Sequence, residues 1–237
     1  MLATRLRAVR ARMAGAAAAA GRPAAALTLV AVSKGQPLDL LIEAYDLGVR
    51  DFGENRVQAL SERAALLAAS GRRPRWYLIG QVQRNKAAAA AQADWVHSVD
   101  RLPLAQALAE RRSSSLPLAV LIQVDLTPGG AAAAGRGGLP PAGVLPLARA
   151  IAQLPQLRLV GLMTVAPLGL APEPSFAALA ACLRALREES AGAHAEHLSM
   201  GMSADFVPAI AAGATLIRIG RDLFGARMPP PAREEKP

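Results

Sequence analysis

The feature that most constrains the fold is the regular alternation of two kinds of segment along the 237 residues. Short apolar runs that are typical of strands lie at 27–33, 50–53, 75–80, 94–99, 117–126, 157–165, 197–200 and 215–220. Amphipathic or alanine- and leucine-rich segments, typical of helices, lie between them at 37–48, 55–70, 84–91, 101–112, 141–154, 173–191 and 203–212. This alternation predicts parallel strands, because each helix carries the chain back across the sheet in a right-handed crossover.

Eight strands with seven intervening helices, in a chain of 237 residues, predict a single closed (β/α)8 barrel. The second and seventh expected strands are short, so an open doubly wound sheet is the alternative. We expect the barrel domain to span 1–228. A loop rich in glycine, alanine and proline is expected at 127–143, and a disordered tail at 229–237.

The N-terminal segment 1–22 is rich in arginine and alanine, as some targeting peptides are. However, Leu2, Leu6, Val9 and Met13 fall on one face of a helix. This pattern favours an extra N-terminal helix that packs on the barrel over a targeting peptide.

The composition is that of a globular chain with a basic surface and a formal net charge of +9. The arginines are scattered singly or in pairs, without a zinc-finger, RNA-recognition or recognition-helix pattern, so we expect no nucleic-acid partner. A phosphorylated small ligand would suit the same charge.

No apolar run approaches the roughly 20 residues that span a bilayer, so no membrane partner is expected. The single cysteine, Cys182, is typical of a reducing compartment and predicts a cytoplasmic protein.

Polar residues and glycines gather where the expected strands end. Sites of (β/α)8 barrels form at the carboxyl ends of the strands. The residues there are Ser33, Lys34, Glu54, Asn55, Gly80, Gln81, His97, Ser98, Asp125, Thr164, Ser199, Met200, Gly201, Arg218 and Gly220. Because the strands that lead to them are apolar, this placement predicts a functional face at one end of the barrel.

Lys34 follows the first expected strand in a chain that uses lysine sparingly. There are 24 arginines but only three lysines, Lys34, Lys86 and Lys236. Desolvation favours a neutral amine, and a neutral amine attacks a carbonyl carbon to form a Schiff base. Arginine cannot do this, so the lysine favours imine chemistry over a side chain that merely reaches solvent. Lys86, at an expected helix start, is interpreted as a cap or loop contact, and Lys236 lies in the tail.

The loops after the seventh and eighth expected strands predict an anion site. Ser199, Gly201 and Ser203 precede a helix, and Ser203 with Asp205 is typical of an N-cap. A helix N-terminus offers free amides to an anion, and glycine at position 220 lets the main chain approach a ligand. These two loops commonly hold a phosphate group in such barrels. Simple capping is the alternative for Ser203.

Arg218 lies between two isoleucines near the end of strand eight. A guanidinium buried there needs an acceptor, which is either a carboxylate such as Asp125 or Glu54, or a group on the ligand.

Glu54 and Asn55 end strand two, either as a helix cap with its acidic first turn or as donors and acceptors for a ligand hydroxyl and the imine region. His97, His194 and His197 show no metal-ligand spacing, so no metal site is expected.

Eight short motifs are spread along the chain from Val30 to about Arg227. They are AVSK at 31–34, DFGEN at 51–55, WYLIGQVQRNK at 76–86, HSVD at 97–100, VLIQVDL at 120–126, GLMTVAP at 161–167, LSMGMSADF at 198–206, and IRIG at 217–220 with LFGAR at 223–227. In this order they resemble the pyridoxal phosphate homeostasis proteins, the YggS/PROSC group.

This resemblance implies a barrel like the N-terminal domain of alanine racemases, which binds pyridoxal 5′-phosphate (PLP) as a Schiff base on Lys34. It also implies that Asn55 lies beside the cofactor and that Arg218 faces the pyridine nitrogen. The phosphate would be held by Ser199, Met200, Ser203 and Gly220. Members of the family are regarded as carriers that buffer PLP and influence amino-acid and keto-acid pools, with PLP-dependent apoenzymes as recipients.

Two positions depart from the family pattern. Gln36 stands where members often have a second lysine, two places after the imine lysine. In the loop after strand five, where members often carry lysine, this chain has AAAAGRGG with Arg136. Both replacements weigh against a transfer of the cofactor between lysines.

An arginine at the ring nitrogen favours a carrier over an enzyme. PLP enzymes that form carbanions usually place a carboxylate there, which keeps the nitrogen protonated. Racemases of this fold type use arginine but supply a tyrosine base from a second domain and a partner subunit. We expect no such domain here, and Tyr45 and Tyr77 fall on a helix and inside a strand. The prediction is therefore a monomeric, non-catalytic PLP carrier. The alternatives are a racemase-like PLP enzyme, a Schiff-base aldolase acting on a sugar phosphate, and an adaptor that uses only the basic surface.

Overall fold

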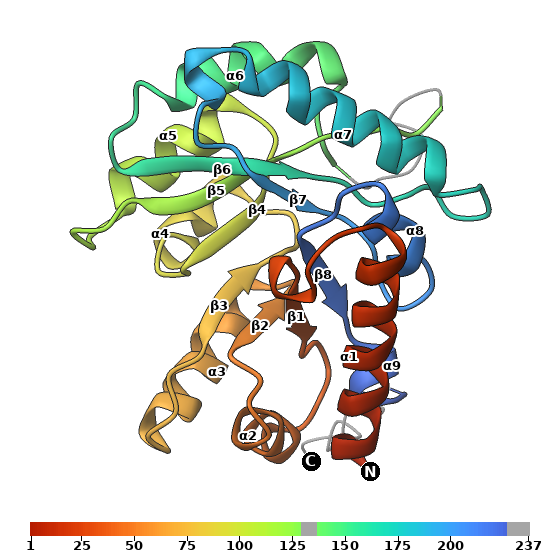
Figure 1. Cartoon of the computed structure of the whole chain (residues 1–237). Helices are drawn as coiled ribbons and strands as arrows, with labels where there is room; N and C mark the ends of the chain where they lie inside the picture. The colour runs from red at the N-terminus through yellow and green to blue at the C-terminus, as the bar shows by residue number, and fades with distance from the viewer. Residues whose placement is uncertain (129–136, 227–237) are drawn as a thin grey trace, which may run out of the picture.

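The computed structural model describes residues 1–128 and 137–226, and within them eight parallel strands form a closed barrel in the order β1-β2-β3-β4-β5-β6-β7-β8 (Figure 1). The strands are β1 (Thr28–Val32), β2 (Asp51–Glu54), β3 (Arg75–Leu78), β4 (Trp95–Val99), β5 (Leu118–Gln123), β6 (Leu157–Met163), β7 (His197–Ser199) and β8 (Leu216–Ile219). Strand β8 pairs with β1 over four residue pairs, which closes the barrel. The predicted (β/α)8 barrel is confirmed, and the open sheet is excluded.

Helices alternate with these strands and cover the barrel. They are α1 (Leu2–Ala19), α2 (Leu38–Asp46), α3 (Val57–Ala69), α4 (Ala87–Ala90), α5 (Leu102–Arg111), α6 (Val144–Ile151), α7 (Glu173–Arg187), α8 (Phe206–Ala211) and α9 (Arg221–Phe224), with a 3-10 turn η2 (Arg84–Lys86) before α4. The predicted helix at 203–212 begins only at Phe206, which changes the interpretation of Ser203 below. The short α9 directly follows β8 and was not predicted.

Two apolar cores follow from the alternation of side chains along the strands. The barrel interior contains Val30, Tyr77, Ala119, Leu121, Val160, Met163 and Leu216. A larger core fills the layer between the strands and the helices, and it includes Ala31, Phe52, Ile217 and Ile219. On β8, Leu216 therefore faces inward whereas Ile217 and Ile219 face outward, as predicted. This alternation places Arg218 on the inward face.

Helix α1 lies against the outside of the barrel beside α8 and α9 (Figure 1). Its buried face is the predicted one, with Leu2, Leu6, Val9 and Met13 almost fully buried. Arg5 donates a hydrogen bond of 2.9 Å to the carbonyl of Phe224 at the end of α9. The N-terminal helix thus packs on the segment that follows β8.

Two predicted features fall wholly or partly outside the described residues. These are the tail at 229–237 and the central part of the 127–143 loop, which includes Arg136. Within residues 1–128 and 137–226, no helix is long and apolar enough to cross a membrane.

Candidate functional site

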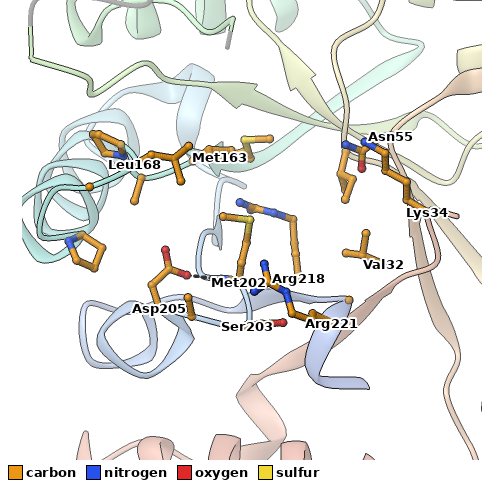
Figure 2. Close-up of a pocket in the computed structure, with 18 of the residues that line it drawn as sticks. Val32, Lys34, Asn55, Met163, Leu168, Met202, Ser203, Asp205, Arg218 and Arg221 are labelled. Atoms are coloured by element: carbon orange, nitrogen blue, oxygen red, sulfur yellow. Dashed lines mark hydrogen bonds between the residues drawn. The ribbon is translucent and has the colours of Figure 1, made fainter. Parts of the chain in front are cut away.

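A cavity of about 810 Å³ opens at the carboxyl ends of β1, β6 and β8. Five of the seven predicted site residues line it: Lys34, Asn55, Ser203, Arg218 and Gly220. Figure 2 shows Lys34 and Asn55 on one side, Ser203 and Asp205 on the other, and Arg218 between them. The sequence motifs that lie far apart along the chain therefore converge on one cavity at the predicted face.

Lys34 stands in a tight turn just beyond β1 rather than inside the strand. The amide of Gln36 donates to the carbonyl of Ser33 over 3.0 Å, and Gly35 has a φ of 70°. A positive φ at the third position of a turn favours glycine. Lys34 is partly exposed, so its desolvation is weaker than the strand pattern predicted. Within the described residues its amine has neither a hydrogen bond nor an ion pair.

The turn is anchored by a buried acidic residue and an arginine. Glu54 is only 1% exposed and accepts hydrogen bonds of 2.6 Å from the hydroxyl of Ser33 and from Arg63 on α3. Arg63 also donates to the carbonyls of Ser33 and Gln36, the latter over 2.8 Å. Glu54 does not line the cavity. Its place in this network differs from both predicted roles, the helix cap and the ligand contact.

Asn55 reaches the cavity because Gly80, after β3, leaves space for it. A Cβ atom at position 80 would lie 2.2 Å from the main-chain oxygen of Asn55, far inside a normal contact. The glycine of the IGQVQRNK motif therefore allows the two loops to approach closely.

Arg218 is buried to 3% exposure in the floor of the cavity. It donates hydrogen bonds to the Ser199 hydroxyl over 2.6 Å and to the Thr164 carbonyl over 2.9 Å. Both acceptors are neutral, so neither of the predicted carboxylates pairs with it. Burial lowers the pKa of Arg218 to about 10, and the charge of Asp205 opposes this shift. The guanidinium thus remains charged at neutral pH without a carboxylate partner in the described residues.

His97 lies in the barrel interior, where it contacts Ser199 and the ring of Tyr77. Its Nδ1 lies 3.0 Å from the Ser199 hydroxyl, and its Nε2 has no hydrogen-bond partner among the described residues. Burial lowers the pKa of His97 well below its ordinary value, and the charges of Arg218 and His197 lower it further. A neutral imidazole is the form that fits beside the charged arginine.

Two predicted phosphate ligands, Ser199 and Met200, do not line the cavity. Both are fully buried. The hydroxyl of Ser199 contacts Arg218 and His97, and the side chain of Met200 belongs to the core outside the strands.

Ser203 lines the cavity, but its predicted role as an N-cap is wrong. Helix α8 begins at Phe206, and the residue before it is Asp205, whose carboxylate accepts the amide of Met202 over 2.6 Å. The hydroxyl of Ser203 instead accepts the amide of Asp222 in α9 over 3.3 Å. Ser203 therefore joins the loop after β7 to the turn after β8, where Gly220 also lines the cavity.

Sequence reasoning missed several residues of the site. Arg63 carried no signal, because a single arginine on an amphipathic helix is ordinary. The remainder of the cavity wall comes from the loop after β6 and from the start of α9, in particular Leu168, Leu170 and Arg221. Lys86 is exposed and does not line this cavity. Among the described residues, no group of three His, Cys, Asp or Glu side chains could hold a metal ion.

Comparison with protein families assigns the class of this barrel. Residues 4–228 match the family of the alanine racemase N-terminal domain. The chain is 44% identical to a pyridoxal phosphate homeostasis protein of Pseudomonas aeruginosa over 226 residues, which covers 92% of this chain and 93% of the relative. It is 39% identical to the protein of that name from Escherichia coli K12, with 92% and 94% of the two chains covered. The chain belongs to the pyridoxal phosphate homeostasis protein family.

Solved structures agree with this assignment. PipY of Synechococcus elongatus, solved without PLP, is 35% identical and superposes with a TM-score of 0.83, covering 95% of this chain and all of PipY. PipY with PLP bound gives a TM-score of 0.82. Alanine racemase of Corynebacterium glutamicum, at 18% identity, shares the fold with a TM-score of 0.66 over 97% of this chain and 63% of the racemase.

Proposed function

We propose that this chain binds PLP in the 810 Å³ cavity, carries it as a Schiff base on Lys34, and buffers the cofactor in the cytoplasm without strong catalytic turnover. The observation that carries the proposal is that Lys34 and Arg218 line the same cavity. Lys34 supplies a primary amine without an acidic partner, and Arg218 supplies a buried guanidinium without a carboxylate. Relatives that bear the name pyridoxal phosphate homeostasis protein, and PipY with PLP bound, support the choice of ligand.

The side of the cavity that is lined by Lys34 and Asn55, here called the lysine side, fits an aldehyde. The amine adds to the aldehyde carbon of PLP, water leaves, and a carbon–nitrogen double bond remains. The amine of Lys34 has no hydrogen bond or ion pair with the described residues, so it is free to meet the aldehyde. Asn55 lines the same side of the cavity and would contact the ring substituents.

The part of the cavity that is lined by Arg218, Ser203 and Gly220, here called the arginine side, fits the other polar groups of PLP. Arg218 would face the pyridine nitrogen, and Ser203 and Gly220 would lie at the phosphate, with Ser199 and Met200 as the further predicted phosphate ligands. A charged guanidinium donates hydrogen bonds but accepts no proton, so it leaves the ring nitrogen unprotonated. The electron-withdrawing power of the ring is then weak, which favours storage of the cofactor over turnover.

A racemase-like enzyme would need a proton acceptor beside Lys34. Tyr77 is buried in the barrel, where its hydroxyl donates to Asp51 over 2.9 Å, and Tyr45 lies under the guanidinium of Arg50. Neither tyrosine lines the cavity. A Schiff-base aldolase would need a comparable acidic group, but Glu54 is engaged by Arg63 and Ser33. The site therefore favours the carrier over both enzymes.

The proposal extends to what the carrier serves. We expect a monomer that passes PLP to PLP-dependent apoenzymes and thereby influences amino-acid and keto-acid pools.

The test is the visible absorption spectrum of the purified protein with PLP, followed by borohydride reduction and peptide mapping. We expect a yellow wild type with the label fixed on Lys34. Lys34→Ala should be colourless, and Lys86→Ala, an exposed lysine outside the cavity, should match the wild type. A colourless wild type, or label on Lys86, contradicts the proposal. Rapid turnover of an amino acid by the yellow protein would overturn its non-catalytic part.

A further inference from the structure

We propose that Arg63, on the outer helix α3, is the positioning residue for the amine of Lys34, and that it acts together with Glu54. This inference rests on the proposed function, in which Lys34 is the residue that reacts with the aldehyde. Arg63 does not line the cavity. It acts through the turn formed by residues 33–36, which carries the lysine.

The guanidinium of Arg63 holds this turn on both sides of the lysine. It donates to the carbonyl of Ser33, immediately before Lys34, and over 2.8 Å to the carbonyl of Gln36, two residues after it. The same group donates over 2.6 Å to the carboxylate of Glu54. A planar guanidinium with several fixed donors can meet all three acceptors at once, which a lysine ammonium could not do with the same geometry.

The two ends of the turn depend on Arg63 to different degrees. Ser33 is also tied to β2, because its amide donates to Gly53 over 3.0 Å and its hydroxyl donates to Glu54 over 2.6 Å. At the other end, the amide of Gln36 donates back to Ser33 within the turn. The bond from Arg63 to the Gln36 carbonyl therefore fixes that end to the rest of the barrel. Without it, this end of the turn would be held by the amide of Gln36 within the turn and by the start of α2 at Leu38.

The ion pair between Arg63 and Glu54 is more deeply buried than the other ion pairs of the described residues. The side chains of Glu54 and Arg63 are 1% and 17% exposed. In the pair between Arg72 and Asp46, by contrast, they are 25% and 53% exposed. A buried pair contributes little net stability compared with apolar side chains of similar size, because both ions lose their hydration. We infer that this pair is a positioning device for the turn.

The experiment separates placement of the amine from binding of the ligand. The variant Arg63→Gln is compared with Arg72→Gln, which removes a partly exposed arginine that pairs with Asp46 and has no bond to the turn. Each protein is given PLP and, separately, pyridoxine 5′-phosphate, which has the same ring and phosphate but an alcohol in place of the aldehyde. Stopped-flow absorbance follows formation of the covalent linkage, and calorimetry gives the affinity for the alcohol.

For Arg63→Gln we expect the covalent linkage to form about 10- to 100-fold more slowly, because a small misplacement of a reacting group has effects of this size. Its affinity for pyridoxine 5′-phosphate should stay within about threefold of the wild type, since the arginine side of the cavity is intact. Arg72→Gln should match the wild type in both measurements. Arg63→Lys, which keeps the charge but not the planar group, should restore little of the rate.

Removal of Arg63 alone leaves Glu54 buried without its partner, which is strongly destabilising and can prevent folding. The double variant Arg63→Gln with Glu54→Gln removes this charge and keeps the amide groups in place. The inference is overturned if a folded Arg63 variant forms the linkage at the wild-type rate, or loses affinity for the alcohol as strongly as it loses rate. Failure of the proposed function is distinct, because the wild type itself would then show no visible band with PLP.

Discussion

Lys34 and Arg218, on the two sides of the cavity, are held in opposite ways. Lys34 lies in a turn, partly exposed and without a partner in the described residues, and its position depends on Arg63 and Glu54. Arg218 lies on a strand in the barrel floor, 3% exposed, and is held by direct bonds to Ser199 and Thr164. A group that must react with an incoming aldehyde has to remain accessible and able to move. A group that only recognises the ligand is better fixed by the barrel itself.

The electrostatics of the two sides differ as well. On the lysine side, the charge of Glu54 compensates the charge of Arg63. On the arginine side, both acceptors of Arg218 are neutral, and burial lowers the pKa of this residue to about 10. A ligand that brings acceptor groups to Arg218 should therefore stabilise the protein, by about 2.7 kcal/mol when its concentration is 100 times the dissociation constant.

The largest effect is expected from Lys34→Ala. This change removes the amine, so the visible band with PLP and the borohydride label should disappear completely. The free energy of unfolding without ligand should change by less than about 0.5 kcal/mol, because Lys34 forms no bond with the described residues. Spectroscopy and urea unfolding check the two parts. A strong loss of stability would show that the lysine side is structural, as the arginine side is.

The next effect is expected from Arg218→Met. Loss of a charged hydrogen bond to the ligand should weaken PLP binding by about 10- to 150-fold, which calorimetry measures. Without ligand, two terms oppose each other: the Thr164 carbonyl loses its donor, and the cost of burying the guanidinium disappears. The free energy of unfolding should therefore change by less than about 2 kcal/mol.

Arg184→Met, on the exposed face of α7, is the matched control for Arg218→Met and should change neither quantity. If Arg218→Met binds PLP as tightly as the wild type, Arg218 does not contact the pyridine nitrogen, which would contradict the proposal.

A smaller effect is expected from Ser199→Ala, and it decides between two roles of this serine. If the hydroxyl only orients Arg218, as the 2.6 Å bond indicates, PLP affinity should fall about 3- to 10-fold and the visible band should persist. If Ser199 holds the phosphate directly, the loss should equal or exceed that of Arg218→Met. Calorimetry with PLP and with inorganic phosphate distinguishes the two outcomes.

The barrel could be predicted from sequence because short apolar runs, typical of strands, alternate with helical segments along the chain. Five of the seven predicted site residues line the cavity because the ends of barrel strands meet at one face. What escaped prediction depends on contacts between distant segments. The contact of Arg63 with residues 33–36 links positions about 30 apart in the chain, and no local pattern marks it. Similarly, the start of α8 was misplaced because Ser203 and Asp205 are both capping residues, and only the fold decides which one precedes the helix.

The smallest effect is the change with pH in the free energy of unfolding that comes from the buried His97. The folded state lowers the pKa of His97 well below its ordinary value, through burial first and then through the charges of Arg218 and His197. Below about pH 6.5 the unfolded chain takes up a proton at this position whereas the folded chain does not, so the protein should lose stability as the pH falls. One histidine contributes at most about 1.4 kcal/mol per pH unit. Urea unfolding between about pH 5 and pH 8 should show this loss in the wild type.

The matched variant is His97→Asn, which keeps a polar group near Ser199 but does not titrate. It should show a smaller loss of stability in acid. Some loss should persist because burial also lowers the pKa of His197. Arg218→Met should reduce the acid sensitivity as well, since it removes the second cause of the shift in His97. Lys34→Ala should leave it unchanged, because Lys34 is not among the causes of that shift. An equal reduction in variants of both sides would contradict the separation of the cavity into a reactive side and a fixed side.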